Sequence, residues 1–198
     1  MEWLIIPLAY ILGSLPSGII VARLMGGMDP RSGGSGNIGA TNVLRTLGKK
    51  AAVATLLADA AKGLIPVLIA RGLLPSGSPL VYFAAGAAIL GHDFSFLLRF
   101  KGGKGVATTF GTLIALSPAV ALLCLGTWIS VVVVTRYSSA GALTSAAMSP
   151  MFALFMARDS GFALFCLAAA TLLAWLHREN IRRLLAGTES RIGEKKNT

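Results

Sequence analysis

The chain contains 198 residues, of which 55% are hydrophobic and only 13% are charged. Soluble globular domains usually carry about 25% charged residues, so this composition excludes a water-soluble protein. Its 18 Lys and Arg residues outnumber 8 Asp and Glu residues and give a formal net charge of +10. In a membrane protein this excess reports topology first, so we interpret it as a topology signal and expect no nucleic-acid partner.

Six apolar stretches follow one another along the sequence, at residues 4–25, 51–70, 80–98, 106–134, 140–157 and 161–176. The first is expected to be a retained span rather than a signal peptide, because only Glu2 and no basic segment precedes it. The fourth exceeds the roughly 20 residues that one span needs. It contains Pro118, which disfavours helix at Ser117, so this stretch forms either one kinked helix or two short ones.

The distribution of basic residues decides between these two alternatives, because cytoplasmic loops carry the Lys and Arg excess. With a break at Pro118 there are seven spans, and 14 basic residues lie on one side against 2 on the other, whereas six spans give 8 against 8. The larger group includes six residues of the C-terminal tail, namely Arg178, Arg182, Arg183, Arg191, Lys195 and Lys196.

The sequence therefore predicts an all-α integral membrane protein with seven transmembrane helices, the N-terminus outside and the C-terminus cytoplasmic. We expect residues 1–198 to form a single transmembrane domain. The fourth helix, residues 106–116, would be about 16 Å long, which is only half of the bilayer. Such a short helix, opening on a glycine-rich loop, is typical of an anion site.

Polar residues concentrate in three segments on the predicted cytoplasmic side, at residues 33–45, 91–109 and 177–189. The first segment places hydroxyl, amide and guanidinium groups among four glycines, a composition that suits a phosphate or a carbonyl oxygen. A flexible interfacial loop is the alternative. The polar side chains in question are Ser35, Asn37, Thr41, Asn42 and Arg45.

The second segment contains His92 and places two lysines and three glycines directly before the short helix, in the run Lys101, Gly102, Gly103, Lys104, Gly105. Cations, backbone amides and a helix dipole would then converge on one place. The run is not a Walker A loop, because glycine follows Lys104 and no strand precedes it. A basic anchor at the membrane surface is the alternative.

In the third segment, His177 and Asn180 stand three residues apart and would share a helix face. Its arginines are most simply headgroup contacts. Inside the second span, Asp59 and Lys62 are also three residues apart, and they are either functional residues or a mutually neutralising pair. Cys124 and Cys166 lie in apolar runs, and we assign them neither a disulfide nor a metal.

These three segments resemble, in order, the motifs of the bacterial integral-membrane glycerol-3-phosphate acyltransferases that use acyl phosphate. GSGNIGATNVLR matches the first motif, GH followed by FKGGKGVAT the second, and HREN followed by GTE the third. Ser95 departs from the pattern, which has proline there. The resemblance covers essentially the whole chain and implies a seven-span fold with a cytoplasmic-facing site, in the bacterial cytoplasmic (inner) membrane.

The resemblance implies transfer of a fatty acyl group from acyl phosphate to the sn-1 hydroxyl of glycerol 3-phosphate, which yields lysophosphatidate for phospholipid synthesis. Partners would be these two substrates and membrane lipids, and we expect a monomer. The glycerol-3-phosphate and catalytic set it implies is Ser35, Arg45, Lys104, His177 and Asn180. The implied phosphate and acyl-carbonyl contacts are Asn37, Thr41, Gly102 and Gly103, and we also expect Asn42, His92 and Lys101 to bind substrate.

A protein base is not evident in the sequence. The His and Asp pair of many other acyltransferases is missing, because Leu97 stands five residues after His92 and Arg182 stands five after His177. We therefore expect substrate-assisted catalysis, without cofactor or metal. A small transporter of an organic phosphate or other anion is the main rival, although transporters usually bind near the bilayer midplane. A structural or lipid-sensing protein would leave the Ser, Asn and Thr cluster unexplained.

Overall fold

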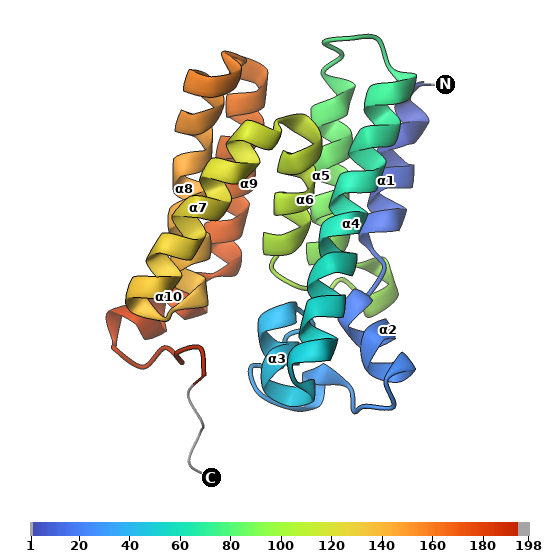
Figure 1. Ribbon diagram of the computed structural model, residues 1–198. Coiled ribbons are helices and arrows are strands. Elements are labelled where there is room, and N and C mark those ends of the chain that lie inside the picture. Colours follow the sequence, from blue (N-terminus) through green and yellow to red (C-terminus); the bar gives the residue numbers. More distant parts are fainter. Residues whose placement is uncertain (1, 194–198) are drawn as a thin grey trace. The chain divides into compact units, whose positions relative to one another are not determined.

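The computed structural model describes residues 2–193, and this part of the chain is helical without a strand (Figure 1). Two compact units, Met1–Leu116 and Ser117–Thr198, divide the chain. The basic residues Lys195 and Lys196, which entered the topology prediction, lie outside the described residues.

The first unit is built from α1 (Ile5–Gly13), α2 (Ser17–Leu24), α3 (Ala40–Leu47), α4 (Lys49–Leu73), α5 (Leu80–Asp93) and α6 (Val106–Leu116). Short 3-10 turns cover η1 (Glu2–Leu4), η2 (Pro30–Ser32) and η3 (Phe96–Leu98). Figure 1 shows α2 and α3 beside the same end of α4, near the loop that joins α5 to α6.

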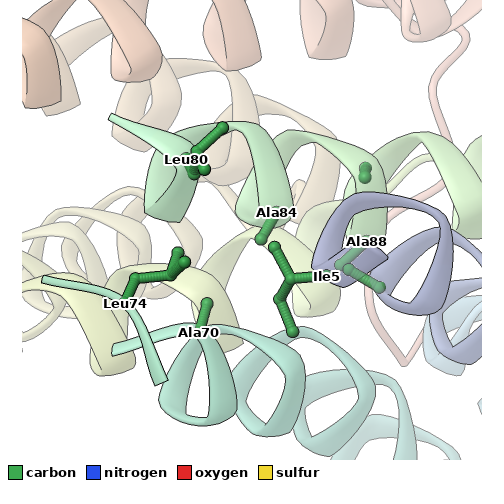
Figure 2. Close-up of a cluster of buried hydrophobic side chains, with 8 residues drawn as sticks. Ile5, Ala70, Leu74, Leu80, Ala84 and Ala88 are labelled. Carbon is green, nitrogen blue, oxygen red and sulfur yellow. The ribbon is translucent and has the colours of Figure 1, made fainter. Parts of the chain in front are cut away.

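Small residues allow the helices of this unit to pack closely. Ile5 of α1, Ala70 of α4 and Ala84 of α5 belong to one buried cluster, which Figure 2 shows. An added Cβ at Gly63 would lie 2.1 Å from the Thr108 carbonyl oxygen, so α4 and α6 meet backbone to backbone. Helices in a membrane associate through such packing, because lipid is as apolar as their side chains.

The second unit contains α7 (Pro118–Thr135), α8 (Ser138–Phe152), the π-helical turn η4 (Ala153–Ala157), α9 (Ser160–Leu176) and α10 (Arg178–Leu185). Helix α8 packs against both α7 and α9. The Ser145 hydroxyl of α8 donates to the Cys124 carbonyl of α7 at 2.8 Å. Cys124 and Cys166 are buried and free.

Within the described residues, four segments are long and apolar enough to cross a membrane, and bent pairs raise the number to six. The four are Lys49–Leu73, Leu80–Leu98, Pro118–Thr135 and Ser138–Ala157. The bent pairs are α1 with α2, at 43°, and α9 with α10, at 64°. Helix α6 is a separate shorter apolar helix.

The predicted break in the long fourth stretch is confirmed. Helix α6 ends at Leu116, and α7 begins at Pro118 after Ser117, whose side chain accepts a hydrogen bond from the Val120 amide at 3.4 Å. Proline at the first helical position needs no amide partner there, which favours a new helix start over a kink. The amphipathic helix α3 in the first polar segment was not predicted, and α10 was predicted only as a continuation of the last span and not as a separate helix.

Candidate functional site

The first polar segment, around α3, and the second, between α5 and α6, lie toward the same end of the first unit (Figure 1). The Ser95 hydroxyl donates to the Ser14 carbonyl at 2.6 Å, and the Tyr10 hydroxyl donates to the Phe94 carbonyl at 2.7 Å, which ties the second segment to α1. A cavity of about 320 Å³ lies beside this junction. Its described lining includes none of the predicted site residues and consists of Pro16, Ile19, Ile20, Arg23, Arg31, Leu97, Leu98 and Arg99.

The buried side chain of Asn42 holds the first segment through hydrogen bonds to its backbone. Its side chain is 2% exposed, and its amide group donates to the carbonyls of Pro30 at 2.7 Å and Asn37 at 2.8 Å. Its Oδ1 accepts from the Ser35 amide at 2.7 Å. The structure thus uses Asn42 to shape the loop that carries Ser35, and a direct contact of Asn42 with substrate stays a prediction.

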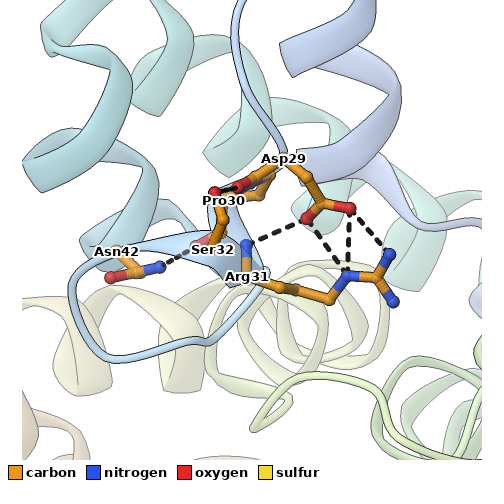
Figure 3. Close-up of polar contacts among 5 residues, drawn as sticks. All are labelled: Asp29, Pro30, Arg31, Ser32 and Asn42. Atoms are coloured by element: carbon orange, nitrogen blue, oxygen red, sulfur yellow. Dashed lines mark hydrogen bonds and ion pairs between the residues drawn. The ribbon is translucent and has the colours of Figure 1, made fainter.

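The turn before this loop is closed by an ion pair. Figure 3 shows Arg31 wrapped around the Asp29 carboxylate, with Nη2 at 2.7 Å from Oδ2 and the Arg31 backbone amide at 2.9 Å from Oδ1. The hydrogen bonds from the Arg31 side chain lower the pKa of Asp29 below its usual 3.8. Because both groups are exposed, this pair contributes little to stability.

The other predicted residues of the first segment lie around α3. Ser35, Thr41 and Arg45 are exposed, the last two on α3 itself. Asn37 is half-buried, and its Oδ1 accepts from the Gly39 amide at 2.9 Å, just before the helix begins. Ser35, Thr41 and Arg45 are therefore accessible beside a loop whose backbone is held by hydrogen bonds to Asn37 and Asn42.

The second segment folds its glycines onto the end of α5. The amide of Gly102 donates to the Asp93 carbonyl and that of Gly103 to the His92 carbonyl, each at 3.0 Å. These two amides are therefore used within the protein, which differs from the expectation that they face an anion. A substrate contact by another atom of Gly102 or Gly103 stays a prediction. Lys101 is exposed and Lys104 is half-buried, directly before α6.

A buried polar cluster lies beneath this loop. Asp59 is 2% exposed, Lys62 6% and His92 4%. The Lys62 ammonium lies 2.9 Å from Asp59 Oδ1, so the predicted neutralising pair does form. The Nδ1 of His92 also lies 3.5 Å from this oxygen. The His92 ring is buried against Gly103 of the glycine loop, and its predicted contact with substrate stays a prediction.

The third segment belongs to the second unit. His177 is buried at the junction of α9 and α10, and its Nδ1 lies 2.8 Å from the Leu173 carbonyl. Sequence reasoning treated His177 and Asn180 as neighbours on one continuous helix face, whereas the chain bends by 64° between the two helices. The Asn180 amide group donates to Glu189 Oε1 at 2.6 Å.

Glu189 is the residue of this segment that sequence reasoning missed. Its carboxylate accepts from Ser139 and Asn180 at Oε1 and from Arg183 at Oε2, each at 2.6 Å. Burial alone would raise the pKa of Glu189, but these hydrogen bonds outweigh it and hold the pKa below its usual 4.5. Its place in the GTE part of the third motif, within a strongly basic tail, was the available signal.

Comparisons with known proteins agree along nearly the whole chain. A family model described as glycerol-3-phosphate acyltransferase matches residues 3–187. A glycerol-3-phosphate acyltransferase from Methylococcus capsulatus is 47% identical over 197 residues, which cover 99% of this chain and 98% of that protein.

Two solved structures are also similar. One is a crystal structure of PlsY (YgiH), an integral membrane glycerol 3-phosphate acyltransferase, in its glycerol 3-phosphate form. It is 39% identical with a TM-score of 0.92, over 97% of this chain and 96% of that one. The lysophosphatidic acid form of PlsY is 38% identical with a TM-score of 0.91, over 97% of this chain and 95% of that one.

Proposed function

The chain belongs to the glycerol-3-phosphate acyltransferase family, and on this premise we propose that it transfers a fatty acyl group from acyl phosphate to the sn-1 hydroxyl of glycerol 3-phosphate. The products are lysophosphatidate and inorganic phosphate. Similarity over 97% of the chain to a crystal structure of an acyltransferase in its glycerol 3-phosphate form is the observation that carries this proposal. As a family member the chain is an acyltransferase of the bacterial membrane.

The charges of the two substrates explain the basic loops. Each substrate carries a phosphate with a second pKa near 6, so up to about four negative charges must converge. Arg45, Lys101 and Lys104 would offset this repulsion, together with the N-terminus of α6. Ser35, Asn37 and Thr41 would add neutral hydrogen bonds around the phosphate and the acyl carbonyl.

The reaction itself needs little from a protein base. The glycerol hydroxyl oxygen attacks the acyl carbonyl carbon, the bond from that carbon to the phosphate oxygen breaks, and the departing phosphate takes the hydroxyl proton. Lys104 and Ser35 would stabilise the charge that develops on the carbonyl oxygen. His177 and Asn180 would orient glycerol 3-phosphate, which makes the protein's main task one of alignment.

The proposal includes a topology. Seven spans result if α1 with α2 forms one, α8 with η4 forms another, and α4, α5, α6, α7 and α9 each form one. The basic residues favour an outside N-terminus and a cytoplasmic C-terminus, with the site facing the cytoplasm. Glycerol 3-phosphate would then arrive from water and the acyl chain from the inner leaflet. The two units would act as one monomeric domain.

Donor competition tests the reaction. Purified protein is given labelled glycerol 3-phosphate with acyl phosphate, acyl carrier protein thioester or acyl-coenzyme A. We expect lysophosphatidate from acyl phosphate alone, with equimolar phosphate release. Product from a thioester would contradict the proposed donor, and no product with any donor would contradict the reaction.

The pH dependence of kcat tests the proposed source of the base. Without an essential protein base, the profile should show no ionisation near neutrality that disappears in His177→Ala. A neutral-range ionisation that this substitution removes would instead assign the proton transfer to His177.

A further inference from the structure

The buried pair Asp59 and Lys62 has no role in the reaction just described. Ionisable residues inside a membrane protein are costly and usually serve a function. In α4 this pair lies nearly inaccessible, at 2% and 6% exposure, so it gains nothing from water. If Asp59 and Lys62 served only to neutralise one another, neither would need a further contact. Each of them nevertheless has one, Asp59 with His92 and Lys62 with the Leu15 carbonyl.

The first additional partner is His92. Its Nδ1 lies 3.5 Å from Asp59 Oδ1, the same oxygen that Lys62 approaches at 2.9 Å. A carboxylate can only accept hydrogen bonds, so the approach is attractive only when Nδ1 carries the ring proton. At 3.5 Å this is a close electrostatic approach and not a formed hydrogen bond, and it favours a His92 ring that carries its proton on Nδ1.

The opposite edge of the His92 ring supports the glycine loop. An added Cβ at Gly103 would lie only 2.0 Å from His92 Nε2, so the ring and the Gly103 backbone are already in contact. The Gly103 amide also donates to the His92 carbonyl at 3.0 Å. The position of the His92 ring thus fixes the position of the Gly103 backbone, and Lys104 directly follows Gly103.

The second additional partner is the break between α1 and α2. The Lys62 ammonium donates to the Leu15 carbonyl at 2.7 Å, in the bend that precedes Pro16. Lys62 therefore neutralises Asp59 and ties α4 to the neighbouring helix at the same level. The carboxylate is fixed from one side by Lys62, and it fixes His92 on the other.

We propose that Asp59 is a positioning residue for acyl transfer, which holds His92 beneath Gly103 and so fixes the loop that carries Lys104. This inference rests on the proposed function. Asp59 touches no substrate, and its effect reaches the reaction through His92 and the loop backbone. Loss of this support lets Lys104 move relative to the developing charge, which lowers kcat more than it raises either KM.

Kinetics with isosteric variants test the inference. We expect Asp59→Asn to lower kcat per folded enzyme by about 10- to 100-fold, with both KM values changed by less than about threefold. His92→Gln should lower kcat similarly, and the double variant should be no worse than about twofold below His92→Gln alone, because both act through one contact. Multiplied effects in the double variant would overturn the inference.

Two further variants separate positioning from folding. Asp59→Asn with Lys62→Met removes the buried ammonium together with its nearest carboxylate, while the buried Asp93 that also faces Lys62 is kept. This variant should restore folding but not kcat. Asp159→Asn is the matched control, because Asp159 caps the start of α9 by accepting from the Phe162 amide at 2.8 Å, and asparagine caps a helix equally well. Normal kcat in the first of these variants would overturn the inference, and so would an equal loss in the control.

Histidine NMR gives a readout that does not depend on activity. The chain has only two histidines, so ¹⁵N-labelled His92 and His177 give two ring systems that one substitution assigns. We expect a protonated Nδ1 on His92 in the wild type and its loss or exchange in Asp59→Asn. A neutral His92 that carries its proton on Nε2 in the wild type would overturn the inference, whatever the activities of the Asp59 variants. Wild-type protein without transferase activity would contradict the proposed function and leave this NMR result standing.

Discussion

The two glycine-rich loops of the first unit look alike in sequence but are held by different interactions. The loop before α3 is supported by the neutral side chains of Asn42 and Asn37, and its Gly34 and Gly36 adopt left-handed φ angles of +60° and +69°. The loop before α6 rests on His92 above a buried ion pair. There Gly103 is required because no side chain fits. Gly36 thus provides backbone freedom in the first loop and Gly103 provides space in the second, whereas Gly34 and Gly105 combine a positive φ with a close neighbour.

Gly103→Ala is expected to give the largest effect. The new Cβ would lie 2.0 Å from His92 Nε2, and a displaced loop should lower kcat/KM by about 100-fold. Steady-state assays of purified protein measure this. In the control Gly86→Ala of α5, where the added Cβ meets nothing within 4 Å, activity should persist and stability should rise by roughly 0.5–1 kcal/mol. Wild-type activity in Gly103→Ala would contradict the claim that position 103 has no room for a side chain.

Asn42→Ala is expected to come next. It leaves the Pro30 and Asn37 carbonyls and the Ser35 amide without their partner, which should lower the free energy of unfolding by roughly 1–3 kcal/mol. Thermal unfolding in detergent measures it. Asn42→Asp keeps the acceptor for Ser35 but loses both donors, so it should not restore stability. Full stability with aspartate would show that the donors are unimportant.

Gly36 offers a finer contrast with Gly103. The nearest atom to an added Cβ is the Arg31 carbonyl oxygen at 3.7 Å, so Gly36→Ala adds only left-handed strain of roughly 1–2 kcal/mol. Gly36→Asn should be milder, since asparagine adopts this conformation more readily. At position 103 asparagine should be no better than alanine. Thermal unfolding measures the stability of the asparagine and alanine variants at both positions. If asparagine were milder than alanine at position 103 as well, the proposed difference between the two loops would be contradicted.

The third motif differs from both loops, because a carboxylate organises it. The pKa of Glu189 is lower when folded than when unfolded, so its stabilising effect is complete above the unfolded value near 4.5. This effect is lost as pH falls through the lower folded value. We expect the unfolding temperature to drop across this acidic range and Glu189→Gln to flatten the dependence. An unchanged slope in the variant would exclude Glu189 as its source.

Sequence patterns predicted the elements that depend on local signals. The division at Pro118 and the short helix Val106–Leu116 followed from one proline and the hydropathy pattern. Helix α3 and the separation of α10 from α9 were not predicted, because each of these helices has only eight residues and a strongly polar face. Such short helices are stable only through tertiary contacts, which hydropathy does not report.

In the candidate site, too, local features could be predicted from the sequence, whereas tertiary contacts could not. Composition identified the polar segments, because glycines, hydroxyls and lysines rarely gather in membrane proteins without a reason. The support of each loop could not be predicted, since Asn42 reaches the Pro30 carbonyl 12 residues away and Asp59 meets His92 from another helix. Such contacts depend on how helices pack, and residue spacing within one helix carries no information about them.

The most direct test of the central claim compares Ser35→Ala and Lys104→Ala with the wild type, using acyl phosphate and glycerol 3-phosphate and following lysophosphatidate and phosphate together. If the two loops stabilise the developing charge, each substitution should lower turnover by about 100-fold or more, with the two products still equimolar. Near-normal turnover in both variants would contradict the account.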